Sequence, residues 1–146
     1  MKERELIRVA MQIAIAAHRD QKDLDGNEAI YHPLEVGLAG NDTLEMIVGF
    51  LHDVVEDSDK FTFEYLEEQG IPKEAVEALK LLTHAKGEPY ADYVRRIAES
   101  GNELAIAVKL HDLNHNLERG KRGGHWKQVK KHTLGKEIIE TLINKP

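Results

Sequence analysis

The chain has 146 residues, with 26 Asp and Glu against 20 Lys and Arg, which gives a formal charge of −6. This length corresponds to about one domain with its own core, and the acidic balance is unfavourable for binding duplex nucleic acid. The absence of cysteine excludes disulfides and thiolate metal sites and is typical of a reducing, cytoplasmic compartment. No apolar run reaches the roughly 20 residues of a membrane span, and the charged start MKEREL lacks the apolar core of a signal peptide.

Apolar residues recur at helical spacing through most of the chain, beginning with the stripe Leu6, Ala10, Ile13 and Ala17. This stripe predicts a helix over about 3–19, followed by a polar loop over 20–27. Pro33 is typical of the first turn of a short helix. In the next helix Asp42 and Glu45 have the spacing of a capping box, and the apolar face continues to Val55.

Gly and Pro residues then separate the later elements. Further helices are expected between these breaks, over 62–70, 72–83, 89–101 and 103–118. A Gly/basic loop over 119–124, more typical of a solvated loop than of a phosphate-binding one, precedes a last amphipathic helix from Trp126 to Leu142. No segment alternates with period 2, so no strands are expected. The sequence predicts a single all-α domain, residues 1–146, with about seven helices.

The strongest chemical signal is the run His52-Asp53-Val54-Val55-Glu56-Asp57. At about 100° per residue, its polar side chains fall within an arc of roughly 140° on one helix. His52 and Asp53 offer a neutral nitrogen and an anionic oxygen, a combination suited to a divalent ion. Glu56 and Asp57, one turn along, could orient a water or protonate a leaving group. The alternative is a solvated acidic helix end, and this segment alone favours neither.

A second polar line borders the core stripe of the predicted helix over 103–118. Three residues share one face there, namely Lys109, Asp112 and Asn116. His111 and His115 are also one turn apart, but they point roughly 80–140° away from that face, so one site is not expected to use both pairs. Taken alone, His32 before Pro33 is expected to be structural.

In combination these residues resemble the HD superfamily of metal-dependent phosphohydrolases. More narrowly, they resemble the hydrolase domain of RelA/SpoT-type alarmone enzymes and their small stand-alone relatives. The resemblance extends from Ala17-His18 to about Arg119. Four patterns carry it: AH-x-x-Q at His18 and Gln21, His32-Pro33, LHDVVED at Leu51–Asp57, and K-L-x-D-x-x-x-N at Lys109–Asn116.

The resemblance implies an all-α HD fold and a divalent metal ion, often manganese, held by His32, His52, Asp53 and Asp112. It also implies that Glu56 and Asp57 position and activate the attacking water. Candidate substrate-binding residues are Lys109, Asn116 and, as a shifted phosphate contact, Lys22. The implied enzyme is a nucleotide phosphohydrolase, and its best single substrate is guanosine 3′,5′-bis(diphosphate), which would lose pyrophosphate from its 3′ side. A chain of this length has no room for a synthetase domain, so synthesis is not expected.

Two departures concern the nucleotide pocket. Asp23-Leu24 stands where alarmone hydrolases commonly carry a basic pair, and Glu28-Ala29 stands where Pro-Tyr is usual. Hydrolysis of another nucleotide, such as a nucleoside monophosphate, is therefore an alternative. A non-enzymatic nucleotide-sensing or protein-binding module with a structural metal site is a second alternative, and a purely structural bundle is a third. The expected partner is a small nucleotide, without nucleic acid or membrane, and the sequence does not fix the oligomeric state.

Overall fold

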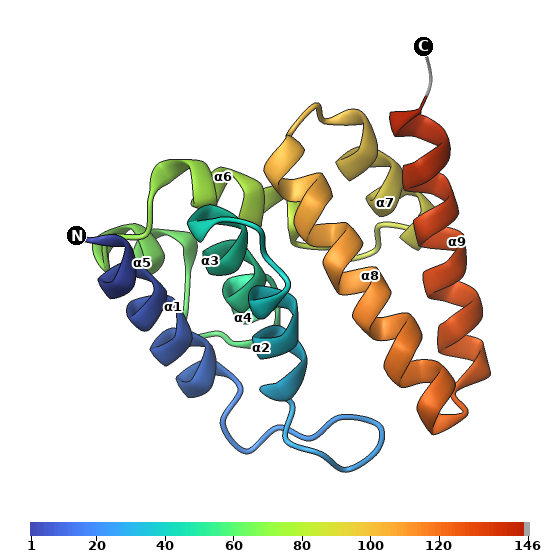
Figure 1. The fold of residues 1–146 in the computed structure, drawn as a ribbon, viewed down its shortest axis with the longest axis horizontal. Helices are drawn as coiled ribbons and strands as arrows, with labels where there is room; N and C mark the ends of the chain where they lie inside the picture. The colour runs from blue at the N-terminus through green and yellow to red at the C-terminus, as the bar shows by residue number, and fades with distance from the viewer. Residues whose placement is uncertain (145–146) are drawn as a thin grey trace.

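Nine helical segments follow one another in the computed structural model, which describes residues 1–144 (Figure 1). Within that range the only extended pairing is an isolated bridge between Lys22 and Glu28. The prediction of an all-α fold is therefore confirmed. Residues 145–146, the end of the predicted domain, lie outside the described part of the chain.

The helices form two groups in Figure 1, with α8 between them. Their bounds are α1 (Glu3–Ala17), α2 (Tyr31–Leu38), α3 (Thr43–Leu51), α4 (Val54–Asp57), α5 (Phe63–Glu68), α6 (Lys73–Leu82), α7 (Tyr90–Glu99), α8 (Glu103–Gly123) and α9 (Trp126–Ile143). Helix α8 contacts α2, α3 and α6 on one side and α7 and α9 on the other. It therefore joins the N-terminal group to the C-terminal pair.

Helix α3 lies at the centre of the N-terminal group, where it contacts α1, α2, α6 and α8. The apolar side chains of its second half are at most 1% exposed, namely Ile47, Val48, Phe50 and Leu51. A helix segment whose side chains are all apolar is stable only when other elements enclose it. Because α3 is enclosed, the residues that follow its last turn also begin in the interior.

Two glycines allow α2 and α3 to cross closely. A Cβ atom at Gly49 would lie 2.7 Å from the Cα atom of Gly37, and one at Gly37 would overlap the ring of Phe50. Helix α2 carries His32, and His52 directly follows α3. The close crossing brings these two imidazoles together, with ring centroids 5.1 Å apart.

Two predicted boundaries are wrong. The expected helix through Val55 is broken, since α3 ends at Leu51 and Asp53 becomes the N-cap of a short α4. His52 Nδ1 donates to the Gly49 carbonyl, and such local side-chain bonds compete with a continuing helix. At the other end of the chain, α8 continues through the expected loop until Gly124, whose left-handed conformation (φ 70°) ends it.

We expect Gly49→Ala to lower the free energy of unfolding by about 1–3 kcal/mol, because the added methyl group would overlap the α2 backbone. Leu38→Ala is the matched control, since Leu38 is 64% exposed on α2, and it should change stability by less than about 0.5 kcal/mol. Urea unfolding followed by circular dichroism measures both. A Gly49→Ala protein as stable as the parent would contradict the close crossing.

Candidate metal centre

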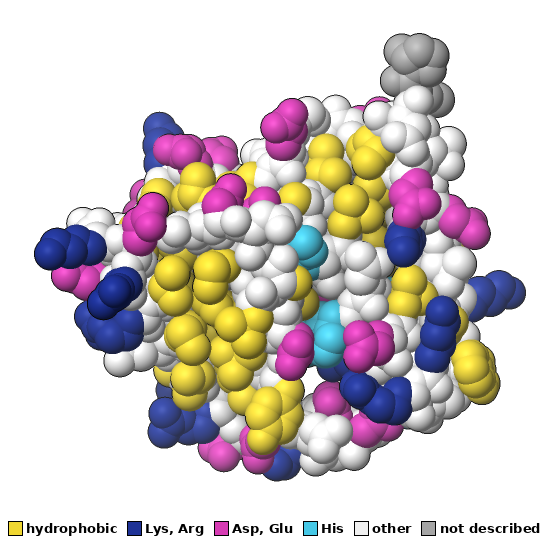
Figure 2. Space-filling view, viewed as in Figure 1, with side chains coloured by type: hydrophobic (Ala, Val, Ile, Leu, Met, Phe, Trp, Pro, Cys, Tyr) yellow, Lys and Arg dark blue, Asp and Glu magenta, His cyan; other side chains and the backbone are white. Residues whose placement is uncertain are grey.

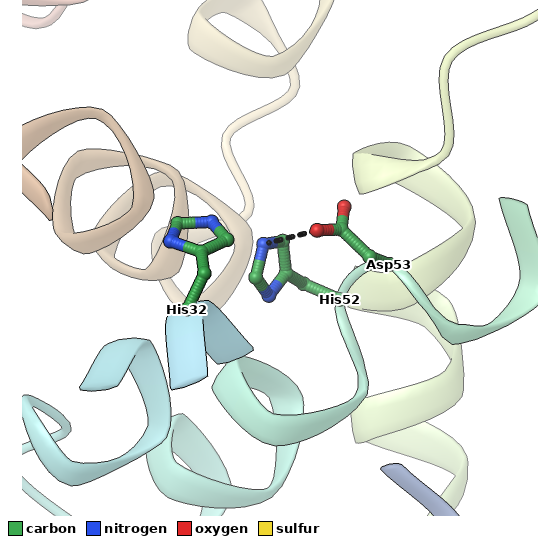
Figure 3. Close-up of side chains that lie close together, drawn as sticks. All are labelled: His32, His52 and Asp53. Carbon is green, nitrogen blue, oxygen red and sulfur yellow. Dashed lines mark ion pairs between the residues drawn. The ribbon is translucent and has the colours of Figure 1, made fainter. Parts of the chain in front are cut away.

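Four polar side chains from α2, the α3–α4 turn and α8 meet beside the buried end of α3. His52 Nε2 lies 3.1 Å from Asp53 Oδ2 and 3.3 Å from Asp112 Oδ1. His32 Nε2 lies 2.8 Å from the same Asp112 oxygen. Figure 3 shows how His32, His52 and Asp53 face one another, each offering an atom within 4.8 Å of the others. The structure thus brings together the four residues predicted to bind metal, while their role as ligands stays a prediction.

The donor set fits a divalent cation. His52 Nδ1 donates to the Gly49 carbonyl at 2.7 Å, which fixes this nitrogen as the donor. The opposite nitrogen, Nε2, is buried and has no partner in hydrogen-bond geometry among residues 1–144, although two carboxylates face it. In the neutral form of His52 this nitrogen carries a lone pair that can bind a metal in place of a proton, and mixed nitrogen and carboxylate ligands suit ions such as manganese or zinc.

The carboxylates control the electrostatics of this cluster. Burial opposes the charged form of His52, but Asp53 and Asp112 raise its pKa well above the usual value. Despite burial, the charge on His52 lowers the pKa of Asp53 to about 2. Burial also disfavours the charged form of Asp112, yet the Lys109 ammonium holds its pKa well below the ordinary range. Two ionised carboxylates in a largely buried site attract positive charge.

Lys109 lies behind Asp112 and is 7% exposed. Its Nζ donates to Asp112 Oδ2 at 2.9 Å and to the Tyr93 hydroxyl at 3.3 Å. Asn116 Nδ2 donates to the other Asp112 oxygen at 3.1 Å. Lys109 and Asn116 therefore orient Asp112, and substrate contact by either stays a prediction. Lys22 is on the α1–α2 loop, where its ammonium pairs with Glu28.

Glu56 and Asp57, the predicted water-activating pair, lie on α4 beside the cluster. Glu56 Oε1 accepts a hydrogen bond of 2.7 Å from the His84 backbone N–H. The Asp57 carbonyl accepts one from the Gln21 side chain at 3.3 Å. Partial desolvation, together with the charges of Asp53 and Glu56, raises the pKa of Asp57 to about 6. A carboxyl group that titrates near neutral pH is suited to proton transfer.

His115 also touches the cluster, which the sequence did not predict. Its Nδ1 lies 2.7 Å from His32 Nδ1, and the two rings stack with centroids 5.0 Å apart. His115 follows Asp112 by three residues and is about 60° from it around α8, less than the roughly 80–140° expected, and His32 from α2 contacts both. The i, i+3 spacing of Asp112 and His115 on one helix was the sequence signal for this contact. His111 instead pairs with Glu45 at 3.0 Å.

None of the helices within residues 1–144 has the length and apolarity needed to cross a membrane.

No protein-family model matches the chain, but its sequence is similar to segments of much longer proteins. A chloroplastic putative GTP diphosphokinase RSH1 from Arabidopsis thaliana is 32% identical over 80% of this chain and 15% of its own length. The corresponding protein of Oryza sativa subsp. japonica is 29% identical over 91% of this chain and 17% of its own length. A GTP pyrophosphokinase of Streptomyces coelicolor is 30% identical over 93% of this chain and 17% of its own length. The chain therefore spans less than a fifth of these relatives.

A solved structure described as a metazoan orthologue of SpoT that hydrolyses ppGpp superposes with a TM-score of 0.75. It is 21% identical in sequence, and the match covers 95% of this chain and 85% of that one. The chain therefore resembles a RelA/SpoT-type HD domain in sequence and has the all-α fold of that domain.

Proposed function

We propose that the chain is a metal-dependent phosphohydrolase that releases pyrophosphate from the 3′ side of guanosine 3′,5′-bis(diphosphate). One observation carries the metal-dependent chemistry: carboxylates of Asp53 and Asp112 converge on a buried His52 nitrogen that has no hydrogen-bond partner among residues 1–144. The likeness to proteins named GTP diphosphokinase, and to a SpoT orthologue that hydrolyses ppGpp, supports the choice of nucleotide.

In this proposal His32, His52, Asp53 and Asp112 hold a divalent cation, with manganese as the proposed ion. When bound, the ion would withdraw charge from a phosphoryl oxygen and lower the pKa of a nearby water. Asp53 is the most accessible member of the set, with 30% of its side chain exposed against 6% for His52. Substrate would therefore approach from the Asp53 side.

Glu56 and Asp57 supply the proton transfers. Water would form a bond to the phosphorus next to the ribose, and the bond from that phosphorus to the 3′ oxygen would break. The attacking water loses a proton and the departing 3′ oxygen gains one, so the reaction needs an acceptor and a donor. Because the His84 N–H holds one Glu56 oxygen, the Glu56 carboxylate has a fixed orientation for accepting a proton. Asp57, the neighbouring carboxyl group on α4, is the proposed donor.

Hydrolysis of a different nucleotide is the second candidate function. It is favoured by Asp23, whose carboxylate borders the small pocket next to Asn116 and would repel a phosphate there. Release of phosphate or pyrophosphate from guanosine 3′,5′-bis(diphosphate) and from nucleoside monophosphates, measured side by side, separates the two. Tight nucleotide binding without turnover, in protein confirmed to contain metal, would instead favour a sensing module.

Removing one metal-site carboxylate and one proton acceptor should have different effects. We expect Asp53→Asn to lower manganese affinity by at least about tenfold and turnover with it. Glu56→Gln should keep the metal while lowering turnover by about 100-fold. Glu67→Gln, an exposed change on α5, is the control. Pyrophosphate release with and without chelator, together with elemental analysis, provides the measurements. Unchanged turnover in both site variants would reject the proposal.

His115→Ala should weaken manganese binding by about tenfold, because His32 loses the partner that orients its ring. His115→Gln should recover part of the affinity, since an amide can still pair with His32 Nδ1. His111→Ala, on the same helix but paired with Glu45, should leave affinity within about twofold. Calorimetric titration of metal-free protein tests all three. Equal affinities for His115→Ala and His111→Ala would show that the His32 contact does not support metal binding.

Metal binding should lower the pKa of Asp57 from about 6 by at least about one unit, since the ion would offset the repulsion from Asp53. Carboxyl NMR titration with Mg²⁺, a diamagnetic ion, measures the shift. Without the ion, Asp57 is mostly protonated at pH 5. With it, Asp57 should be at least half ionised there. In Asp53→Asn protein the ion should have little effect, and an ion-independent pKa in protein that binds Mg²⁺ would place the metal elsewhere.

A further inference from the structure

Part of the positive charge of this chain is concentrated in one segment near its C-terminus. Residues 119–136, here called the basic segment, contain seven Lys or Arg and no Asp or Glu, in a chain with 20 basic and 26 acidic residues. The segment comprises the end of α8, Gly124 and the first half of α9. In Figure 2, Lys and Arg side chains gather over the lower end of α8 and α9, close to the histidines at the centre of the view. The overall charge of −6 thus conceals a strongly positive region beside the candidate metal centre.

A small pocket of about 70 Å³ lies between this basic segment and the α1–α2 loop. Asn116, Arg119 and His132 line one side, and Asp23, Leu24 and Asp25 from the α1–α2 loop line the other. Asn116 also donates to Asp112. The pocket therefore begins one hydrogen bond away from a proposed metal ligand.

Arg119 is the cation best placed to bind an anion in this pocket. Its Nε donates to Asn116 Oδ1 at 2.9 Å, which holds the guanidinium at the pocket. No hydrogen bond within residues 1–144 occupies its two terminal nitrogens, and 29% of the side chain is exposed. By contrast, Lys109 is buried against Asp112 and Tyr93. A guanidinium with free N–H groups in a fixed plane is suited to bidentate binding of phosphate.

The opposite side of the pocket carries a carboxylate that competes weakly for Arg119. Asp23 Oδ2 is 3.9 Å from Arg119 Nη1, too far for a hydrogen bond. Asp23 Oδ1 accepts from the backbone N–H groups of Asp25 and Asn27, both at 2.9 Å. Asp23 is therefore held by its own loop, and a phosphate could make the closer contact with Arg119.

We infer that Arg119 binds a phosphate group of an anionic nucleotide in the pocket next to Asn116, and that Asp23 weakens this binding. The inference rests on the proposed function for the identity of the nucleotide. The neighbouring cations Lys121 and Arg122 add long-range attraction, which salt screens. The cations that attract the phosphate would thus belong to the end of α8, on the side of the pocket opposite the loop that carries Asp23.

The test measures binding separately from turnover. Metal-loaded Glu56→Gln protein is titrated with guanosine 3′,5′-bis(diphosphate), with GDP and with guanosine, at two salt concentrations. Arg119→Ala should weaken binding of both phosphorylated probes by about tenfold or more and reduce its salt dependence, while Arg119→Lys should lose less. Guanosine binding should be unaffected. Lys130→Ala is the control, because Lys130 belongs to the basic segment but does not line the pocket.

Asp23→Asn should change nucleotide affinity in the opposite direction from Arg119→Ala. The amide oxygen can still accept the two backbone hydrogen bonds, but the negative charge near Arg119 is gone, so both phosphorylated probes should bind severalfold more tightly. A purely structural role for Arg119 does not predict this gain. Thermal unfolding of each variant checks that the fold is retained.

The outcomes distinguish this inference from the proposed function. Loss of nucleotide binding in Arg119→Ala, combined with no turnover in the parent, supports the inference and removes the hydrolase proposal. Normal turnover in the parent with an unchanged KM in Arg119→Ala overturns the inference and leaves the hydrolase proposal standing. The inference is also overturned if the parent binds neither phosphorylated probe, or if Lys130→Ala loses as much affinity as Arg119→Ala.

Discussion

The buried carboxylate of Asp112 is the charge on which the site depends. Lys109 and Asn116 hold it from within α8, and His32 and His52 reach it from α2 and from the end of α3. Removing one partner of a buried ion pair typically costs about 3–5 kcal/mol, because the remaining charge stays desolvated. Asp112 therefore couples the packing of α2, α3 and α8 to the geometry of the proposed metal ligands.

The backbone makes this convergence possible. The glycines of α2 and α3 let the two helices approach more closely than side chains would allow, and His52 and Asp53 lie in the turn between α3 and α4. A continuous helix would place the two residues about 100° apart around one axis. In the turn, His52 Nε2 lies 3.1 Å from Asp53 Oδ2 and 3.3 Å from Asp112 Oδ1, so His52 joins the two carboxylates at the site.

Sequence periodicity was sufficient for most of the fold, because the stripes that predict each helix are the ones buried in the core, as for Ala10, Ile13 and Ala17 in α1. Periodicity did not select the four residues that meet at the centre, which were implied by the resemblance to HD phosphohydrolases. It could not place the break at His52 or the contact of His115 with His32, since both depend on partners distant in sequence. The α8 extension was missed because Gly120 packs against Val129 of α9, a tertiary contact that overrides the low helix propensity of glycine.

The distribution of charge has more functional meaning than its sum. A protein with a net charge of −6 would repel a polyphosphate if its charges were spread evenly. Here the carboxylates of the proposed metal centre attract a cation, while Arg119 lies at the pocket and the other cations of the basic segment follow it along α8 and α9. An anionic nucleotide would then be attracted by the proposed metal ion on one side and by Arg119 on the other. Its phosphates would lie between Arg119 and Asp53. On this view the acidic loop at Asp23 limits affinity, which favours release of a product that is itself an anion.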